Sequence, residues 1–141
     1  MHVEPFRMAH LHALAERPTQ AHIGAFLQCG PYLQALERSD SWTAFDGDRI
    51  LGCAGLLPIW PGLSHCWALL ADDIGAGMIG VTRCAHRMLR MHTGRIEAYV
   101  EAEFEAGHRW ARILGFERDT PGVLRKWFPD GSGAVLYSRV N

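Results

Sequence analysis

The spacing of apolar residues changes near residue 40, from helical intervals to the alternation and short apolar runs of β-strands. Apolar residues predict a helix over 19–28, which Gly30-Pro31 ends, and a short helical piece over 32–36. We therefore expect a helical part over 1–40. The rest of the chain, 41–141, is expected to hold a sheet, a central helix and a C-terminal hairpin within the same single domain.

Three strands are expected after residue 40. Residues 41–45 and 49–57 flank the tight-turn sequence Asp46-Gly47-Asp48, and Pro58 ends the second of these strands. A continuous apolar run over 65–71 predicts a third strand, of the kind that is covered on both faces of a sheet.

Two helices and three more strands follow in the pattern. The expected elements are a helix over 75–91, a strand over 95–100, a helix over 101–114 and a hairpin of strands over 123–128 and 134–140. A strand, a helix and a strand in succession predict a right-handed parallel crossover. The expected fold class is therefore α/β (α+β), with a mixed, mostly antiparallel sheet that contains one parallel pair.

Composition narrows the functional classes. Fourteen basic and fifteen acidic side chains give a formal net charge of −1, which argues against a nucleic-acid-binding protein. The longest apolar run, 50–60, is too short to span a bilayer and contains a proline. The four cysteines form no CxxC pair, so we expect reduced thiols, a cytoplasmic location and no metal site.

The segment 69–80 joins a strand end to a helix start through a loop that holds Gly75 and Gly77. A helix N-terminus offers unpaired N–H groups and the positive end of a dipole, and glycines let an anion approach the backbone. This segment is therefore a candidate phosphate site. The alternative is that the glycines only form a tight connection between the two elements.

The order of elements and two short motifs resemble the GCN5-related N-acetyltransferase (GNAT) superfamily over residues 41–140. In that family the loop after the fourth strand reads Gln/Arg-x-x-Gly-x-Gly/Ala, and here the six positions read Asp72-Asp73-Ile74-Gly75-Ala76-Gly77. A later helix of the family ends in Gly-Phe, as here at Gly115-Phe116. The resemblance implies the GNAT-like acyl-CoA N-acyltransferase fold, with acetyl-CoA or another acyl-CoA as co-substrate and no metal.

The resemblance also implies a site, in which backbone amides near Leu70 and Ala71 polarise the thioester carbonyl where the fourth and fifth strands splay apart. Candidate bases for the attacking amine are Glu97, Glu101 and His65, with Glu97 preferred. For each of them the alternative is a solvated or ion-paired surface group. Replacing Glu97 by glutamine is expected to lower turnover more than substrate affinity. The residues expected to hold acetyl-CoA are Leu70, Ala71, Ile74, Gly75, Ala76 and Gly77.

Three positions depart from the family's pattern. Asp72 occupies a place usually given to a polar or cationic side chain, Ala111 that of a frequent tyrosine, and Phe104 that of a frequent asparagine. The sequences Ala71-Asp72-Asp73 and His108-Arg109-Trp110 are similar to GNAT-like proteins of tailed bacteriophages.

Two hypotheses follow from the matches and the departures. The first is an N-acyltransferase, phage-encoded, that acts on a small-molecule or protein amine. The second is a GNAT-fold protein without catalysis, which serves as a binding module or an internal virion protein. A further alternative is a modulator of a host enzyme, with or without acyl transfer. The location is the host cytoplasm, or the virion if the protein is a phage structural component. Neither hypothesis involves a nucleic acid or a membrane span.

Overall fold

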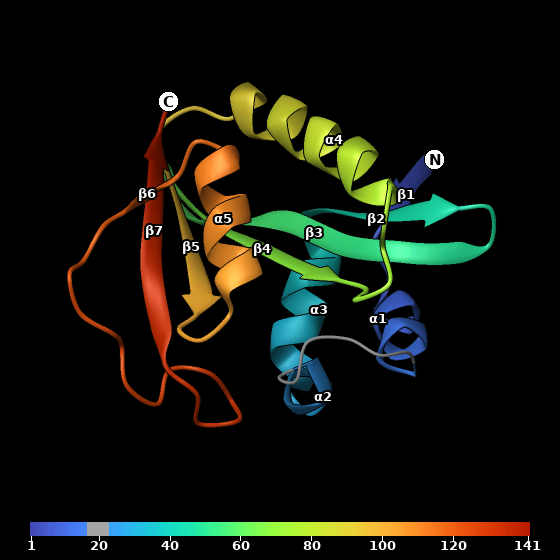
Figure 1. Cartoon of the computed structure of the whole chain (residues 1–141), viewed down its shortest axis with the longest axis horizontal. Helices are drawn as coiled ribbons and strands as arrows, with labels where there is room; N and C mark the ends of the chain where they lie inside the picture. Colours follow the sequence, from blue (N-terminus) through green and yellow to red (C-terminus); the bar gives the residue numbers. More distant parts are fainter. Residues whose placement is uncertain (17–22) are drawn as a thin grey trace.

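The computed structural model describes residues 1–16 and 23–141, which form one seven-stranded sheet with helices on both faces (Figure 1). The strand order is β1-β2-β3-β4-β5-β7-β6, and the β4–β5 pair is parallel whereas the other neighbours are antiparallel. The expected mixed, mostly antiparallel sheet is confirmed. The strands are β1 (His2–Pro5), β2 (Asp40–Asp46), β3 (Arg49–Trp60), β4 (Leu63–Leu70), β5 (Arg95–Glu101), β6 (Glu117–Arg118) and β7 (Ala134–Val140).

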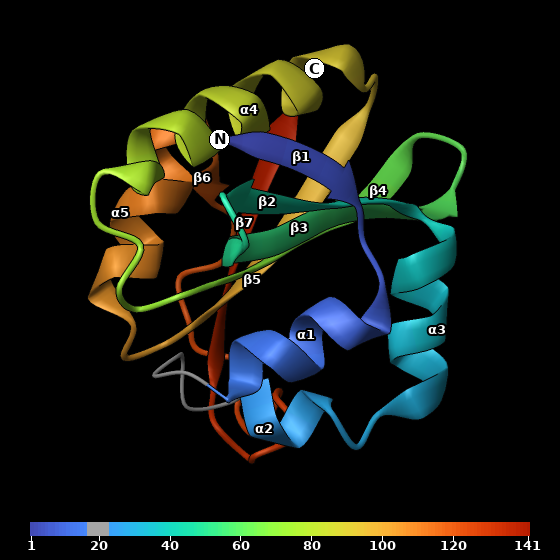
Figure 2. The ribbon, with the colours of Figure 1, turned by 90° about the vertical axis from the view of Figure 1, so that its right-hand side faces the viewer.

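Two groups of helices cover opposite faces of the sheet (Figure 2). α1 (Met8–Ala15), α2 (Ile23–Phe26) and α3 (Gly30–Arg38) lie on one face, and α4 (Gly77–Met91) and α5 (Glu105–Ile113) lie on the other. Among the helices of the described ranges, none is long and apolar enough to cross a membrane.

Each face of the sheet has its own apolar cluster. Leu11 and Leu33 pack with Trp67 of β4 on the α1–α3 face, whereas Leu89 and Ala111 belong to the cluster on the α4–α5 face. Successive side chains of a strand point to opposite faces. Neighbouring residues of β4 therefore contact different helix layers, so this one strand contributes side chains to both faces of the sheet.

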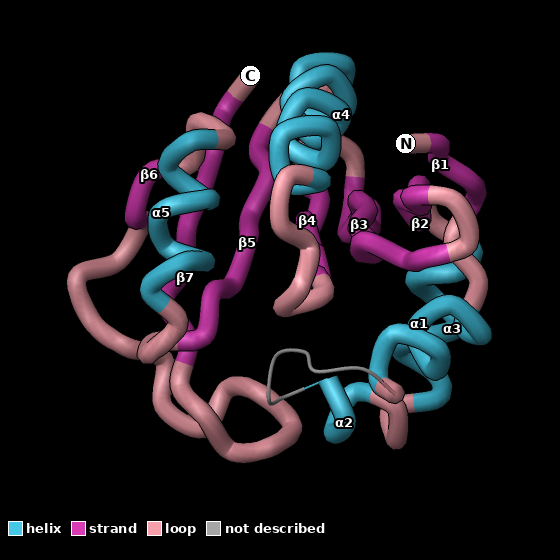
Figure 3. Tube along the Cα trace, turned by 45° about the vertical axis from the view of Figure 1, so that its right-hand side comes forward, coloured by secondary structure: helices cyan, strands magenta, loops and turns pink. Residues whose placement is uncertain are grey.

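The parallel strands β4 and β5 separate toward their carboxyl ends (Figure 3). Their register pairs end at Cys66 and Ala98, although β4 continues to Leu70 and β5 to Glu101. Beyond this point β4 leads toward α4, while β5 stays paired with β7. The expected divergence of these two strands is confirmed, and it opens the sheet between the two helix layers.

The prediction of an entirely helical part over 1–40 is wrong at its start. Residues 2–5 form β1, which pairs with β2 at the edge of the sheet. A strand of four residues is too short to show a clear alternation of apolar side chains.

Gly30-Pro31 begins α3 instead of ending a helix, because the first turn of a helix does not need the N–H that proline lacks. Residues 19–22 of the helix predicted over 19–28 lie outside the described part.

Two predicted element boundaries, the end of β3 and the start of α5, also differ from the observed ones. Strand β3 runs through Pro58 to Trp60, and an irregularity in the pairing between these residues accommodates the proline. The helix predicted over 101–114 begins only at Glu105, because β5 keeps pairing with β7 as far as Glu101. Its predicted end is correct, since Gly115 follows with a φ of +85°.

The predicted strand over 123–128 is wrong. Leu124 forms only an isolated bridge with Ala134, and the neighbour of β7 at the edge is β6. Lys126 has a φ of +54°, which an extended strand cannot contain. The segment between β6 and β7 is instead a long loop, which carries Phe128 to within 6.1 Å of the Phe26 ring of α2.

Candidate active site

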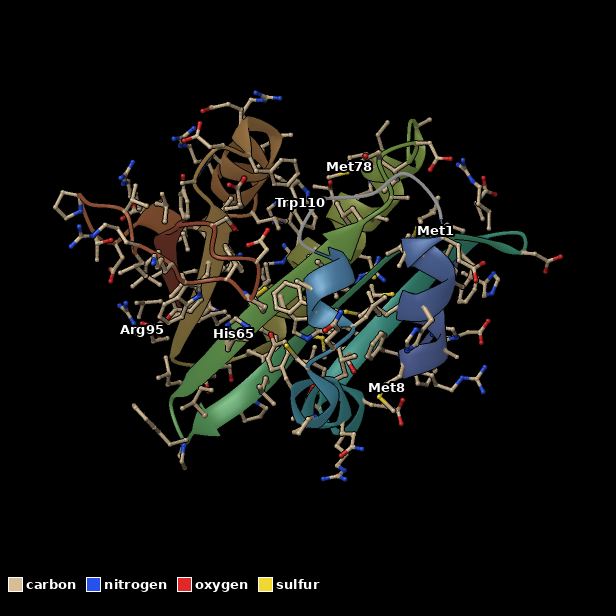
Figure 4. All side chains as sticks on the ribbon, turned by 90° about the horizontal axis from the view of Figure 1, so that it is seen from below. Met1, Met8, His65, Met78, Arg95 and Trp110 are labelled. Atoms are coloured by element: carbon tan, nitrogen blue, oxygen red, sulfur yellow. The ribbon has the colours of Figure 1, made fainter. Side chains whose placement is uncertain are left out.

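A cavity of about 270 Å³ lies between the diverging strands and the helices α4 and α5. We call it the α5-side cavity. Trp110 of α5 donates its indole N–H to the hydroxyl of Thr82 on α4 at 2.9 Å, which ties the two helices together beside it (Figure 4). Its wall includes Leu70, Ala71, Asp72, Ile74, Met78, Ala98, Val100, Glu101, Phe104, Gly107, Trp110 and Ala111.

The glycine loop before α4 is folded tightly on itself. Gly75 has a φ of +56°, a conformation that favours glycine. A Cβ on Gly77 would lie 3.1 Å from the methyl groups of Leu51, so glycine allows the close approach of this loop to β3. Among the described residues, no backbone carbonyl accepts a hydrogen bond from the N–H of Gly75 or Ala76. These two amides are therefore available to an anion at the start of α4.

The six residues predicted to hold acetyl-CoA divide into two groups. Leu70, Ala71 and Ile74 line the α5-side cavity, and the remaining three, 75–77, form the turn that leads into α4. The expectation that Ala71 polarises a carbonyl is wrong, because its N–H donates to the Leu51 carbonyl at 2.9 Å. Backbone donors alternate in direction along a strand, so the Leu70 N–H faces β5, where the pairing has ended.

The two adjacent aspartates of the loop have different surroundings. Asp72 lines the α5-side cavity and is exposed. Asp73 lies beside Arg49, whose guanidinium donates to the Asp73 carbonyl oxygen at 3.2 Å and lies 3.6 Å from its carboxylate. Of these two aspartates, Asp72 is therefore the one whose charge bears directly on a ligand in the cavity.

The other two departures from the family pattern also lie in this wall. Ala111 is buried, so the cavity has a methyl group where the family often has a phenol. The Phe104 ring packs so closely on Gly107 that a Cβ there would lie 2.5 Å from it. Phe104 is thus a packing residue at the start of α5.

A larger cavity of about 590 Å³ lies on the opposite face, between the sheet, α2, α3 and the β6–β7 loop. We call it the α3-side cavity. His65 lies in its wall, where its Nε2 is 3.1 Å from the Tyr32 hydroxyl and its ring is 5.7 Å from that of Tyr99. Burial lowers the pKa of His65, and the nearby Glu97 opposes this effect. The imidazole is therefore neutral at pH 7 and able to accept a proton.

Glu97 lines the same cavity and belongs to an ion-paired group. Its carboxylate accepts a hydrogen bond from Arg95 Nε at 2.8 Å, and Arg95 also contacts the Asp119 carboxylate at 2.7 Å (Figure 4). The hydrogen bond from Arg95 holds the pKa of Asp119 below its usual range. Glu101, the third predicted base, lines the other cavity. The structure thus brings His65 and Glu97 together and places Glu101 apart.

Four residues belong to the walls of both cavities: Cys66, Trp67, Ala68 and Tyr99. They lie where the β4–β5 pairing ends, so the two cavities meet across the opening in the sheet. Burial raises the pKa of the Cys66 thiol to about 12, which excludes a thiolate there at neutral pH. Within residues 1–16 and 23–141, the buried Trp67 Nε1 finds no hydrogen-bond acceptor, so a bound group with an acceptor atom would satisfy it.

Sequence reasoning missed several residues of the α3-side cavity. Tyr32 and the aromatic pair Trp127 and Phe128 come from segments whose positions depend on tertiary structure, and no local signal marks them. Arg95 could have been found, because residues two apart on a strand share a face and Glu97 follows at that spacing. Trp60, at the end of β3, lines the same cavity, and 63% of its surface is accessible.

Comparison with known proteins supports the fold. No protein-family model and no curated protein sequence matches the chain. The ribosomal-protein-alanine N-acetyltransferase of Brucella melitensis has a TM-score of 0.68 at 18% identity, with 100% of both chains covered. The ribosomal-protein-S18-alanine N-acetyltransferase of Escherichia coli has a TM-score of 0.69 at 13% identity, with 97% of this chain and 91% of that chain covered.

A third solved structure, a GNAT-family acetyltransferase from Bacillus anthracis, has a TM-score of 0.64 at 12% identity and covers 98% of this chain and 93% of its own. The chain therefore has the fold of the GNAT N-acetyltransferases. At these identities the likeness shows the fold alone, because one fold can carry many different functions.

Proposed function

We propose that the protein is an N-acyltransferase that moves an acetyl group from acetyl-CoA to an amine. The observation that carries the proposal is the meeting of two cavities on opposite faces of the sheet, which share Cys66, Trp67, Ala68 and Tyr99 where β4 and β5 part. Two substrates that enter from opposite faces would bring their reacting atoms together at this point.

The α5-side cavity suits the acyl donor. Acetyl-CoA supplies an acetyl group activated as a thioester. The N–H groups of Gly75 and Ala76, at the start of α4, would hold its pyrophosphate, and the Leu70 N–H would donate to the carbonyl oxygen. Asp72 opposes this binding by charge, whereas Asp73 is held beside Arg49.

The α3-side cavity suits the amine. The bound ammonium first releases one proton to solvent. The neutral amine nitrogen then attacks the acyl carbon, the new C–N bond replaces the C–S bond, and the sulfur leaves with the electron pair and takes a proton from solvent. His65 accepts the proton that the amine nitrogen loses on attack, and the hydrogen bond between its Nε2 and the Tyr32 hydroxyl, at 3.1 Å, holds the imidazole in place. Because Glu97 is ion-paired with Arg95, we assign it to binding the ammonium form of the amine rather than to proton transfer.

Acetyl-CoA binding and acetyl transfer test the proposal separately. A hundredfold excess of acetyl-CoA over its Kd is expected to add about 2.7 kcal/mol of apparent stability in thermal unfolding. Release of free CoA with a mixture of amines would then report transfer. No stabilisation by millimolar acetyl-CoA would contradict the assignment of the α5-side cavity.

A second candidate function is binding without transfer. Ala111 favours it, because the cavity has no tyrosine at the position from which the family often protonates the departing thiolate. An internal virion protein and a phage-encoded modulator of a host enzyme are forms of this function. Stabilisation by acetyl-CoA without release of CoA for any amine would favour it over the transferase.

A further inference from the structure

The wall of the α3-side cavity is largely aromatic. The rings of Tyr99 and Trp127 stack at a centroid distance of 4.4 Å, and Phe26 stacks on Tyr32 at 5.8 Å. Phe128 of the β6–β7 loop meets Phe26 edge-on, so α2 and this loop close one side of the cavity. A volume of about 590 Å³ is of the size that holds a small organic molecule.

Charge is scarce in this wall. Of its described residues, one is a carboxylate, Glu97, and one an imidazole, His65, and none is a lysine or arginine. Burial raises the pKa of Tyr32 to about 12, so its phenol is uncharged at neutral pH. Arg95 carries one positive charge between Glu97 and Asp119, so this ion-paired group has one net negative charge.

We infer that the acceptor is a small amine with one positive charge on an aromatic or aliphatic body, an inference that rests on the proposed function. The body would lie among the rings, and the ammonium group would lie beside Glu97 and His65, close to the opening in the sheet. One net negative charge matches one ammonium. A second ammonium would lose its hydration among aromatic side chains without a carboxylate to pair with.

A pair of amines of equal length tests the inference. Hexylamine and 1,6-diaminohexane differ by one terminal amino group, so their comparison isolates the second charge. We expect kcat/KM for hexylamine to exceed that for 1,6-diaminohexane by at least about tenfold. Calorimetry with each amine in the absence of acetyl-CoA is expected to show the same order of affinity. Equal or stronger binding of the diamine, or no binding of either amine, would overturn the inference.

A charge placed in the wall gives a second test. Trp127 is 48% exposed, so Trp127→Glu is compatible with folding and adds a carboxylate at the cavity. This variant is expected to shift the ratio of the two kcat/KM values at least about tenfold toward the diamine. The matched control Ile113→Glu adds the same charge on exposed α5, outside the cavity walls, and is expected to keep the wild-type ratio.

The two proposals fail in different measurements. If acetyl-CoA does not stabilise the protein, the transferase proposal fails. The relative affinities of hexylamine and 1,6-diaminohexane in calorimetry then still test which kind of amine binds in the α3-side cavity. If acetyl-CoA binds and CoA is released faster with the diamine than with hexylamine, the transferase proposal holds and the inferred acceptor class is wrong.

Discussion

His65 of β4 and Glu97 of β5 are register partners in the parallel strand pair, one position before the pairing ends at Cys66 and Ala98. Both side chains line the α3-side cavity, and the charge of Glu97 acts on the pKa of the imidazole. A neutral base and a carboxylate thus lie at the inner end of the cavity, next to the opening toward the α5-side cavity. This relationship leads to the first prediction.

Replacing His65 by glutamine is expected to lower kcat about a hundredfold or more, because the amine would lose its proton acceptor. Burial keeps the pKa of His65 below its ordinary value of 6.5, so the loss of rate that comes from protonation of His65 is expected below pH 6.5. The variant should lack this acidic limb of the pH–rate profile, measured by release of CoA.

Two further variants separate proton transfer from general damage. His12 is exposed on α1, so His12→Gln is expected to keep both the rate and the acidic limb. Tyr32 contacts His65 through its hydroxyl, and Tyr32→Phe is expected to lower kcat about tenfold while the limb shifts in pH. An acidic limb that survives in His65→Gln would show that another group is the base.

The two aspartates of the glycine loop are expected to affect acetyl-CoA binding differently when each is replaced by asparagine. Asp72→Asn removes a charge from the α5-side cavity and is expected to tighten acetyl-CoA binding about fivefold, equivalent to ~1 kcal/mol in a solvated setting. Asp73 lies beside Arg49, so Asp73→Asn is expected to change the Kd little. Calorimetric titration measures both. Equal effects of the two variants would contradict the placement of the pyrophosphate at this loop.

His10 predicts a pH dependence of folding stability. Its Nδ1 accepts the backbone N–H of Arg7 at 3.2 Å and lies 2.7 Å from the Thr43 hydroxyl, so this nitrogen carries no proton. Burial, with a smaller contribution from Arg7, lowers the pKa of His10, while Glu4 and Glu37 act in the opposite direction.

The sign of the His10 effect follows from proton binding. Below its unfolded pKa of 6.5, the unfolded chain binds a proton that the folded chain excludes, so the free energy of unfolding falls as the pH drops. Denaturant titrations at about pH 7.5 and about pH 5 measure this effect. Between these pH values the free energy of unfolding is expected to fall less in His10→Asn than in the wild type, because asparagine keeps a hydrogen-bond acceptor but does not titrate. The exposed His12→Asn should behave like the wild type. An unchanged loss in His10→Asn would exclude this residue as the cause.

Gly107 predicts a packing effect at the start of α5. A Cβ at this position would lie 2.5 Å from the Phe104 ring and 2.9 Å from a Val100 methyl group, so Gly107→Ala is expected to destabilise the protein by about 1–3 kcal/mol. Adding Phe104→Leu should recover part of the loss. Gly122 has open space around it, so Gly122→Ala is expected to be nearly neutral in the same denaturant titration.

Local sequence patterns predict most strands of the sheet, and they also predict the helices α4 and α5. Short apolar runs on both sides of the turn at Gly47 predict β2 and β3, and the glycine loop predicts the start of α4. β1 was missed because its pairing depends on β2, forty residues away in the sequence. The stretch 123–128 has a strand-like composition, yet the positive φ of Lys126 interrupts it.

The site depends more strongly on tertiary structure than the fold does. His65, Glu97 and Glu101 could be named from the sequence as titratable residues on strands, but their separation into two cavities could not. That separation follows from the register of two parallel strands and from the place where their pairing ends, and neither is encoded in a local pattern. The contact between Tyr32 and His65 likewise requires α3 to pack against β4.

The β6–β7 loop supplies Asp119 to the ion-paired group and Trp127 and Phe128 to the aromatic wall. This one loop therefore determines both the polarity and the width of the α3-side cavity. The residues proposed to bind the thioester come from other parts of the chain. Under the proposed function, a different segment grafted between β6 and β7 is expected to change which amines react while the acetyl-CoA side stays intact, which makes this loop the natural place to begin directed evolution.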